Sequence, residues 1–323
     1  MIKSVLKRIF IIIIALIIGF GGAWFYARYI GNDLKMEHES AAVNQLFSAK
    51  SDYSTIVYPF RNWQMKEDPN VLAEGVLMAD IDNDYIFYQK NANVRRPIAS
   101  ITKLMTAVIA SENLPADEPV VISQKALQTD GDPAIFYLNE KVKSFDLLKA
   151  LLMVSSNKGA MALAEAVGEK KFISLMNEKA KELEMTQTTF VEPTGLNFLN
   201  QSSPNDLKKL LKYLLYDKPN LLLISKTPKD KISGENPLVT HELININQIT
   251  QNPQFLSDLQ ITYLGGKTGF TDESWQTFAG LFSVPSKRPN ESPRRIVIVV
   301  LKTPNRYNDI ESLLRWLDKA YIF

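Results

Sequence analysis

An uncharged apolar run near the N-terminus is the first strong pattern in this 323-residue chain. Residues 9–27 carry no charged side chain, whereas a short stub with Lys3, Lys7 and Arg8 precedes them. A helix of about 19 residues is roughly 28 Å long, which nearly matches the hydrocarbon core of a bilayer. The basic stub should stay in the cytoplasm. We therefore expect residues 1–28 to form a cytoplasmic stub and a single transmembrane helix in the cell membrane, with a cleaved signal peptide as the alternative.

Strand patterns occupy both ends of the remaining chain. Residues 75–80 and 85–88 are apolar and β-prone and flank turn-forming residues, which predicts a β-hairpin. Residues 277–284 and 294–301 have the same strand composition. The last segment, residues 306–320, repeats its apolar positions at helical spacing and is expected to be a helix.

The middle of the chain has helical periodicity instead. Apolar residues recur at helical spacing from residue 100 to 112, between Pro97 and Pro115. Further helices are predicted at residues 144–153, 158–167 and 169–183. We interpret the whole middle, from about residue 120 to 216, as an all-helical lobe.

These patterns divide the chain into three parts. Residues 29–57 are polar and mixed in charge, which is typical of a spacer between the anchor and an extracytoplasmic catalytic domain at residues 58–323. Strands at both ends of that domain enclose the helices. The expected fold class is therefore α+β, with an antiparallel sheet flanked by helices beside an all-helical lobe.

Composition excludes several kinds of chemistry. Cysteine is absent, and the only histidines, His38 and His241, are far apart and lack metal-ligand spacing. A thiol nucleophile, a histidine triad and a zinc site are therefore not expected, nor is any other metal or cofactor. The net charge of +2 and the lack of a basic block argue against nucleic acid as a partner. Any acid–base catalysis must therefore use Lys, Asp, Glu or Tyr side chains.

A Ser-x-x-Lys pattern offers a nucleophile and a base. On a helix, this spacing places the hydroxyl and the amine one turn apart on the same face. The pattern starts three times, at Ser4, Ser100 and Ser155, and in isolation it more often marks a helix cap and a solvated lysine. Ser4 precedes the anchor. Ser100 opens a helix, where free backbone N–H groups can stabilise an oxyanion, and this favours Ser100-Ile101-Thr102-Lys103.

Two further motifs follow in order along the chain. Ser155-Ser156-Asn157 lies between two predicted helices and supplies a hydroxyl and an amide, although helix capping explains the same residues. Lys267-Thr268-Gly269 occurs once, and its glycine permits close approach of a substrate backbone to a strand. The lysine and the threonine would offer a cation and a hydroxyl to a carboxylate.

The order Ser-x-x-Lys, Ser-x-Asn, Lys-Thr-Gly is similar to the signature of penicillin-recognising serine enzymes. The flanking segments resemble the D-alanyl-D-alanine carboxypeptidase family, the low-molecular-mass penicillin-binding proteins, over residues 58–323. The resemblance rests on residues 97–106, 190–196, 245–247 and 267–273. It implies a β-lactamase-like fold, a peptidoglycan stem peptide ending in D-Ala-D-Ala as substrate, and β-lactam antibiotics as covalent inhibitors.

The resemblance also implies roles for the motif residues. Ser100 would attack the carbonyl between the last two D-alanines, and Lys103 would take the proton of its hydroxyl. Lys103 must be neutral to do so, and the nearby cation Lys267 would lower its pKa. Ser155 would relay the proton to the leaving amine, and Asn157 would orient Lys103.

Backbone and side-chain groups near Lys-Thr-Gly would bind the substrate. The backbone N–H groups of Ser100 and Phe270, next to Gly269, would form the oxyanion hole. Thr268 and Thr271 would hold the terminal carboxylate. Arg306 would approach the same carboxylate, and the alternative interpretation is that Arg306 is an exposed arginine at the start of a helix.

The sequence leaves three other functions open. A DD-endopeptidase, which cuts cross-links between stem peptides, uses the same reacting atoms. A class A β-lactamase needs a Glu-x-x-x-Asn turn, and the spacing from Glu192 to Asn197 is one residue too long for it. The chain departs from the family at Lys158, Ser274 and Trp275, which leaves a non-catalytic, membrane-tethered binding protein as the last alternative. Ile246 also departs from the polar residue that is frequent at its position.

Overall fold

The computed structural model of the protein describes residues 59–131, 136–252, 254–288 and 291–322. All of them belong to one unit of the chain, residues 55–323. The predicted anchor and spacer, residues 1–57, lie outside the described residues. Among the helices that are described, none combines the length and the apolar composition that a bilayer crossing requires.

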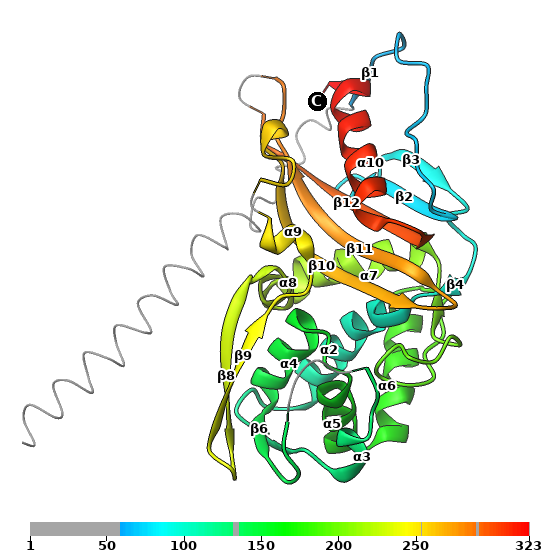
Figure 1. Ribbon diagram of the computed structural model, residues 1–323. Helices are drawn as coiled ribbons and strands as arrows, with labels where there is room; N and C mark the ends of the chain where they lie inside the picture. Colours follow the sequence, from blue (N-terminus) through cyan, green and yellow to red (C-terminus); the bar gives the residue numbers. More distant parts are fainter. Residues whose placement is uncertain (1–58, 132–135, 253, 289–290, 323) are drawn as a thin grey trace, which may run out of the picture. The chain divides into compact units, whose positions relative to one another are not determined.

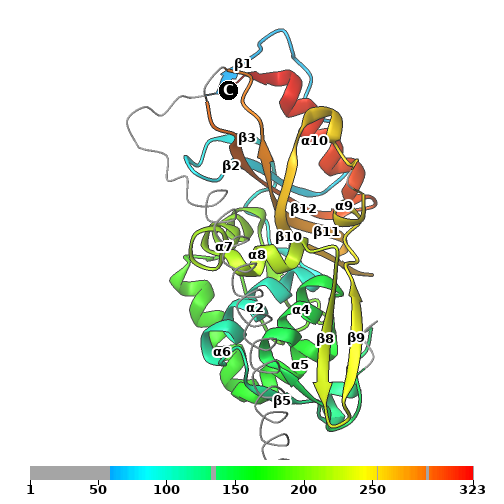
Figure 2. The ribbon, with the colours of Figure 1, turned by 90° about the vertical axis from the view of Figure 1, so that its left-hand side faces the viewer.

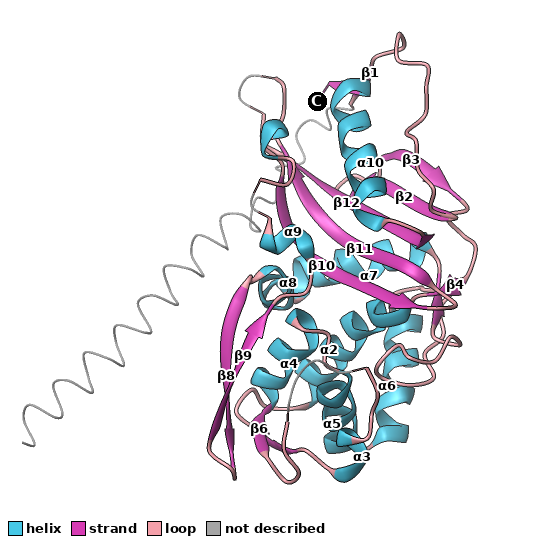
Figure 3. Ribbon diagram, in the orientation of Figure 1, coloured by secondary structure: helices cyan, strands magenta, loops and turns pink. Residues whose placement is uncertain are grey.

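An antiparallel sheet of five strands forms one layer of the fold (Figures 1 and 3). Its order is β10-β11-β12-β2-β3, so strands from the two ends of the described chain lie side by side. The strands are β2 (Gly75–Asp80), β3 (Ile86–Lys90), β10 (Thr262–Thr271), β11 (Trp275–Val284) and β12 (Arg294–Thr303). The predicted hairpin and the two predicted C-terminal strands are confirmed, and β12 pairs with β2 to join them.

Helices cover both faces of this sheet. On one face, α10 (Arg306–Ala320) buries Leu313 and Leu314 in a cluster with Phe278 and Ile298. On the other face lie α7 (Pro204–Asp217) and α8 (Pro219–Lys226), as Figure 2 shows. A sheet that is covered on both faces needs continuous apolar strands rather than alternating ones. All six residues of β2 are accordingly buried.

The helical lobe is built around α2 (Thr102–Asn113), which begins directly after the 3-10 turn η1 (Ala99–Ile101). Every residue from Thr102 to Ala110 is buried. Three helices pack around α2, namely α4 (Ser144–Met153), α5 (Asn157–Val167) and α6 (Glu169–Glu182). The sequence predicted the bounds of these helices to within about two residues.

The prediction of an all-helical lobe is wrong in one respect, because the lobe also carries a sheet of four short strands. Its order is β5-β6-β8-β9, with β5 (Pro119–Val121), β6 (Lys141–Lys143), β8 (Lys229–Glu235) and β9 (Val239–Ile244). In β8 only Ile232 and Gly234 are buried, and the other five residues of the strand are polar or charged. A strand with so little apolar surface gives a weak sequence signal.

The remaining elements are short. They are β1 (Phe60–Arg61), β4 (Arg96–Pro97), α3 (Gln124–Leu127), β7 (Gln201–Ser202), α9 (Gln248–Gln251), η2 (Ser257–Leu259) and β13 (Tyr321–Ile322). Of these, β4 leads the chain directly into η1, and α9 lies in the connection between β9 and β10.

Candidate active site

Ser100 lies in η1 and faces a cleft of about 590 Å³ whose walls come from both the helical lobe and the sheet. The cleft brings together seven of the residues that the sequence singled out, namely Ser100, Ser155, Asn157, Thr268, Gly269, Phe270 and Arg306. Lys103 and Lys267 are buried behind this surface, with at most 2% of their area exposed. Segments that are far apart in sequence therefore meet at Ser100.

Two glycines allow the backbone of Ser100 to be enclosed closely. A Cβ on Gly269 would lie 2.8 Å from the Ser100 nitrogen, closer than real Cβ contacts. A Cβ on Gly195, which has φ +87°, would lie 2.0 Å from the Ala99 carbonyl oxygen. Only glycine permits these approaches. The edge strand β10 and the loop at residue 195 thus hold the nucleophile turn from two sides.

The side-chain nitrogen of Lys103 is the hub of the polar contacts. Its Nζ donates to Ser100 Oγ at 3.1 Å, to Asn157 Oδ1 at 2.5 Å and to the Thr194 carbonyl oxygen at 2.6 Å. Lys103 itself is fully buried. A hydroxyl 3.1 Å from an amine is within direct proton-transfer distance. The predicted pairing of Ser100 with Lys103 is therefore present in the geometry.

The Ser-x-Asn motif occupies the turn between α4 and α5. Asn157 begins α5, and its Nδ2 donates to the Asp130 carbonyl oxygen at 2.6 Å, which fixes the amide that faces Lys103. Ser156 caps α5 through a bond from the Gly159 N–H at 2.9 Å. Ser155 adopts φ +62° and lines the cleft. Capping thus belongs to Ser156, while Ser155 and Asn157 face the cleft.

Lys267 is a cation buried at the centre of the site. Its Nζ donates to the Thr268 carbonyl oxygen at 3.0 Å. Burial, followed by the charges of Lys103 and Arg306, holds the pKa of Lys267 well below its ordinary value. Three basic side chains, those of Lys103, Lys267 and Arg306, therefore lie near one another at the cleft, which favours an anionic group there.

Replacement of Lys267 by methionine is expected to stabilise the fold and impair activity together. Removal of a desolvated charge should raise the free energy of unfolding by about 1–3 kcal/mol. Activity should fall because a substrate carboxylate in the cleft loses the positive charge of Lys267. Because the pKa of Lys267 is lowered, the folded wild type binds fewer protons than the unfolded chain at pH values between that lowered pKa and the ordinary 10.5. Wild-type stability should therefore rise with pH across that window, and the variant should lose this slope.

Thermal melts from neutral to alkaline pH, together with activity measurements, check this expectation. Lys170→Met, at an exposed position of α6, is the matched control and should change neither property. A variant that is both less stable and inactive would contradict the assignment of Lys267 as a strained functional cation.

Arg306 is held in place before any ligand arrives. Its Nη1 donates to the carbonyl oxygens of Gly269 at 2.8 Å and Thr277 at 3.0 Å, and its Nε donates to Gln276 Oε1 at 3.0 Å. Burial lowers the pKa of the guanidinium. The side chain lines the cleft. Arg306 is thus a partly buried component of the site rather than an exposed helix-start arginine.

Thr271 is placed differently from Thr268. Thr268 lines the cleft, whereas Thr271 does not. The Thr271 hydroxyl bonds to Ser274 Oγ at 3.0 Å and accepts from the Ser274 N–H at 3.1 Å. The structure therefore does not bring Thr271 to the carboxylate position that the resemblance implied, because its hydroxyl organises the turn between β10 and β11.

The structure shows where three of the residues that depart from the family pattern lie. Ser274 is fully buried and forms the turn with Thr271, and Trp275 follows it with φ +53° at a position where the family commonly has glycine. Ile246 is 49% exposed and lines the cleft. Its neighbours Asn245 and Asn247 are buried and bond to protein groups. The family's polar contact at residue 246 is thus replaced by an apolar surface.

Glu192 is a structural residue with an effect on the site. Its carboxylate accepts hydrogen bonds from the Thr194 N–H and the Gly195 N–H, both at 2.6 Å, and from Asn200 Nδ2 at 2.5 Å. It also accepts one from the Thr194 hydroxyl. These bonds shape the loop whose Thr194 carbonyl receives Lys103. Glu192 does not line the cleft, so it is not placed to activate a water there.

Glu192→Gln is expected to lower both stability and activity. An amide replaces one acceptor oxygen with an N–H₂ donor, which would face the existing donors and leave buried groups unpaired, at a cost of about 1–3 kcal/mol. The loosened Thr194 carbonyl should then reduce acylation by Ser100. Thermal denaturation and acylation rates measure the two effects, with the exposed Glu273→Gln as control. Normal stability with a long-lived acyl-enzyme would instead indicate that Glu192 activates water.

Several site groups had no sequence signal. The Thr194 carbonyl is a backbone group, and any residue type carries one. Gln276, which fixes Arg306, and the cleft residues Gln248, Asn305 and Asn308 belong to no motif. Only the fold brings them together.

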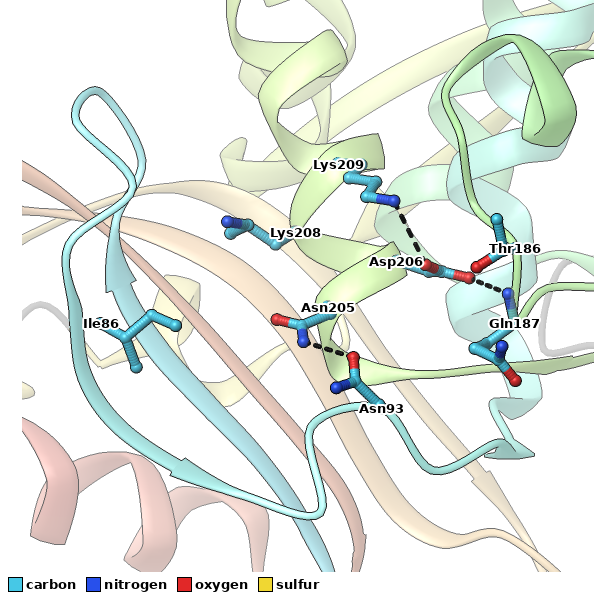
Figure 4. Close-up of a pocket in the computed structure, with 8 residues that line it drawn as sticks. All are labelled: Ile86, Asn93, Thr186, Gln187, Asn205, Asp206, Lys208 and Lys209. Atoms are coloured by element: carbon cyan, nitrogen blue, oxygen red, sulfur yellow. Dashed lines mark hydrogen bonds and ion pairs between the residues drawn. The ribbon is translucent and has the colours of Figure 1, made fainter.

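A second hollow, of about 520 Å³, lies beside the N-terminus of α7 (Figure 4). Its polar groups bond among themselves, with Asn205 Nδ2 donating to Asn93 Oδ1 at 2.6 Å and Asp206 accepting from the Gln187 N–H at 2.6 Å. It contains none of the residues that the motifs singled out. Within the described ranges, no group of three or more His, Cys, Asp or Glu side chains is arranged to hold a metal ion.

Comparison with known proteins places this geometry in context. The sequence model of a family described as D-alanyl-D-alanine carboxypeptidase matches residues 62–304. A D-alanyl-D-alanine endopeptidase of Escherichia coli (strain K12) is 33% identical over 79% of this chain and 80% of its own length. D-alanyl-D-alanine carboxypeptidase DacC from the same organism is 31% identical over 78% of this chain and 63% of its own length.

A solved structure shares the fold. It is a D-alanyl-D-alanine carboxypeptidase from Mycobacterium tuberculosis H37Rv, with a TM-score of 0.69 and 23% identity. The similarity covers 80% of this chain and 96% of the other. At this identity the likeness supports the arrangement of sheet and helices and nothing beyond it.

Proposed function

The chain belongs to the D-alanyl-D-alanine carboxypeptidase family, and on this basis we propose that it removes the terminal D-alanine of peptidoglycan stem peptides through an acyl-enzyme on Ser100. It is a serine peptidase by family. The observation that carries the proposal is the distance of 3.1 Å from Lys103 Nζ to Ser100 Oγ beside the cleft. The chemistry needs a hydroxyl, a buried amine and a bound carboxylate, and it needs no metal or cofactor.

In the proposed first half-reaction, Ser100 Oγ gives its proton to Lys103 and bonds to the carbonyl carbon between the two D-alanines. The C–N bond then breaks, and Ser155 relays the proton from Lys103 to the leaving amine, so that both Lys103 and Ser155 return to their starting states. Asn157 holds Lys103 Nζ through its Oδ1 at 2.5 Å and so keeps the amine aligned with the hydroxyl. In the second half-reaction, water hydrolyses the ester and restores Ser100.

The negative charge that develops on the carbonyl oxygen is assigned to the backbone N–H groups of Ser100 and Phe270. The close approach of Gly269 to the Ser100 nitrogen supports this assignment, because it sets η1 against β10 at this point. Each such donor contributes about 3 kcal/mol to transition-state stabilisation in enzymes of this kind.

The substrate carboxylate is assigned to Thr268 and Arg306, with Lys267 as the buried cation behind them. Thr268 and Arg306 line the cleft together. The fixed guanidinium of Arg306 suits a planar carboxylate better than a mobile ammonium would. Thr271 acts indirectly in this scheme, since it shapes the turn after the strand.

A penicillin provides the direct test, because a β-lactam that mimics D-Ala-D-Ala should acylate the same hydroxyl. We expect the intact mass of the treated protein to rise by one adduct, which peptide mapping assigns to the segment containing Ser100. Release of D-alanine from a pentapeptide completes the assay. Rapid penicillin turnover without a lasting adduct would contradict the carboxypeptidase assignment and favour a β-lactamase.

Cleavage of cross-links is the second candidate function, and the endopeptidase relative at 33% identity favours it. The reacting atoms are the same, and only the leaving group differs. Analysis of muropeptides separates the two: loss of dimers with pentapeptides intact would show an endopeptidase. Ser100 and Ser155 line one cleft, and Lys103 is bonded to Ser100 behind it, which argues against a non-catalytic binding protein.

The proposed location is the outer side of the cell membrane, with residues 1–28 as the anchor. The uncharged run at residues 9–27 and the extracytoplasmic position of peptidoglycan support it. Cell fractionation tests it, since deletion of residues 1–28 should move the protein out of the membrane fraction.

A further inference from the structure

A two-stranded ribbon lies at the end of α10 that is remote from the cleft. In it, β1 pairs antiparallel with β13, and the Asn62 N–H donates to the Ala320 carbonyl oxygen at 2.8 Å. Figures 1 and 2 show β1 beside the C-terminal end of α10, whereas Arg306 begins this helix at the cleft. A helix of 15 residues is about 22 Å long. The ribbon is therefore separate from the site that carries the proposed chemistry.

The ribbon exposes large apolar side chains on both of its faces. Phe60 and Ile322 are register partners, so their side chains share one face, and they are 59% and 43% exposed. Arg61 belongs to the other face, because successive residues of a strand alternate. The ring of Trp63 lies against the Arg61 guanidinium and is 74% exposed. An apolar surface therefore surrounds this edge of the domain.

The exposed ring of Trp63 is held in place by a cation that is packed on the core. The Arg61 guanidinium carbon lies 5.4 Å from the centre of the Trp63 ring, 5.8 Å from that of Trp316 and 5.9 Å from that of Tyr321. Trp316 and Tyr321 are buried and contact each other edge to face. A guanidinium at such distances is attracted to an aromatic ring. Trp63 is thus ordered on the surface of the domain.

The charges of the ribbon favour a phospholipid surface as its partner. Within residues 59–63 and 319–322 the charged side chains are Arg61 and Lys319, and both are cations. Exposed aromatic side chains beside cations are typical of segments that lie at the interface of a bilayer, where the cations meet lipid phosphates. A second copy of the ribbon would instead bring like charges together, which is unfavourable.

The course of the chain also brings the ribbon to the membrane. Phe60 follows directly on residues 1–58, which contain the uncharged run at residues 9–27 that is proposed as the anchor. The intervening segment is polar, and a polar spacer alone would leave the catalytic domain free to rotate. A second contact with the bilayer would fix its orientation.

We infer that the ribbon docks into the headgroup region of the membrane, with Phe60, Trp63 and Ile322 entering the interface. The inference rests on the proposed location of the protein. It adds a second membrane contact, made by the folded domain itself, and it involves none of the reacting groups at Ser100. Docking at this end of α10 would hold the cleft at the other end away from the lipid.

Single nitroxide labels test the inference in the full chain, which contains no cysteine of its own. Ile322→Cys places a label on the ribbon, and Leu238→Cys replaces a side chain that is 89% exposed between β8 and β9. The chain is reconstituted in vesicles of phosphatidylethanolamine and phosphatidylglycerol. Power saturation then compares the access of oxygen, which dissolves in lipid, with the access of an aqueous nickel chelate. We expect oxygen to dominate at residue 322 and the chelate to dominate at residue 238.

A double variant measures how much the aromatic side chains contribute. Phe60→Ser/Trp63→Ser, combined with the label at residue 322, should lower the ratio of docked to undocked ribbon about tenfold, because apolar area is no longer removed from water. Val94→Ser/Leu238→Ser also removes two exposed apolar side chains and is the matched control. This control should leave the ratio unchanged. Thermal melts identify any folding defect, and the label in the otherwise unchanged chain tests docking independently of it.

Three outcomes would overturn the inference. The first is chelate access at residue 322 equal to that at residue 238, which would place the ribbon in water. The second is spin–spin broadening at residue 322 that disappears on dilution with unlabelled protein, which would show a second copy on the ribbon. The third is a chain that fails to float with the vesicles, which would contradict the anchor as well. Each would leave the acyl-enzyme chemistry standing, and penicillin labelling of the same samples monitors that chemistry.

Discussion

Ser100→Ala is expected to reduce D-alanine release by about 10⁴-fold or more, because it removes the hydroxyl that lies 3.1 Å from the amine of Lys103 and is assigned as the nucleophile. Lys103 Nζ also contacts Asn157 Oδ1 and the Thr194 carbonyl oxygen, and neither of these oxygens can act as the nucleophile. The variant should fold normally, since Ser100 is half-buried and the change removes a single oxygen. Steady-state release of D-alanine and labelling by a fluorescent penicillin measure the effect.

Two serine variants provide the controls for this experiment. Ser111→Ala, at the far end of α2, should keep full activity, since its hydroxyl bonds to the Val108 carbonyl and Ser111 does not line the cleft. Ser155→Ala should keep a measurable label but turn over more slowly, because Ser155 is assigned to proton relay. If the Ser100 variant released D-alanine at the wild-type rate, the catalytic assignment would be wrong.

Gly269→Ala should be nearly as damaging, although it removes no functional group. The added Cβ would lie 2.6 Å from Thr277 Oγ1 and 2.8 Å from the Ser100 nitrogen, so β10 and η1 must move apart. A displacement of about 1 Å between reacting groups costs on the order of 10²-fold in rate. Overpacking at this contact should also cost about 1–3 kcal/mol of stability.

Acylation rates and thermal melts measure the effect of Gly269→Ala. Gly75→Ala is the matched control in the same sheet, because its nearest neighbour, Pro204 Cγ, is at an ordinary 3.4 Å. This control should acylate at the wild-type rate. Full activity in the Gly269 variant would show that the close contact between β10 and η1 is not needed for the chemistry.

The elements that could be predicted are those whose apolar residues have a clear period or continuous burial. The bounds of α4 and α10 agree with the expected ranges, because each helix has a strong apolar face against the core. The hairpin of β8 and β9 had no such signal. Its strands expose most side chains and bury few, so pairing with β6 and packing against α4, rather than an apolar pattern, explain their position.

The candidate site was predictable where a motif fixes the residue type, and not where the fold supplies the group. Ser100, Lys103 and Asn157 meet because one short turn and two helices converge, and their spacing in the sequence anticipated it. Thr271 shows the limit of a motif, since its position in the strand was right while its hydroxyl turned to Ser274. The backbone carbonyl of Thr194 could not have been found from the sequence at all.

Glu192 shows why a carboxylate near a site is not automatically catalytic. From the sequence, its distance from Asn197 invited comparison with a β-lactamase turn. In the structure its oxygens are occupied by donors from residues 194, 195 and 200. A carboxylate with its acceptor positions filled is a poor general base.

The immobilisation of Arg306 has a consequence for binding affinity. Its Nε and Nη1 are already bonded to Gln276 and to the backbone of β10 and β11, so its rotamer is fixed in the folded protein. Ordering a free arginine on binding would cost up to about 2 kcal/mol of conformational entropy. In this protein that entropy is already lost during folding, so ordering of the arginine no longer reduces the free energy of binding when the carboxylate arrives. Affinity for the substrate therefore depends on the integrity of the β10–β11 edge, and local fraying there should weaken binding at temperatures where the core is still folded.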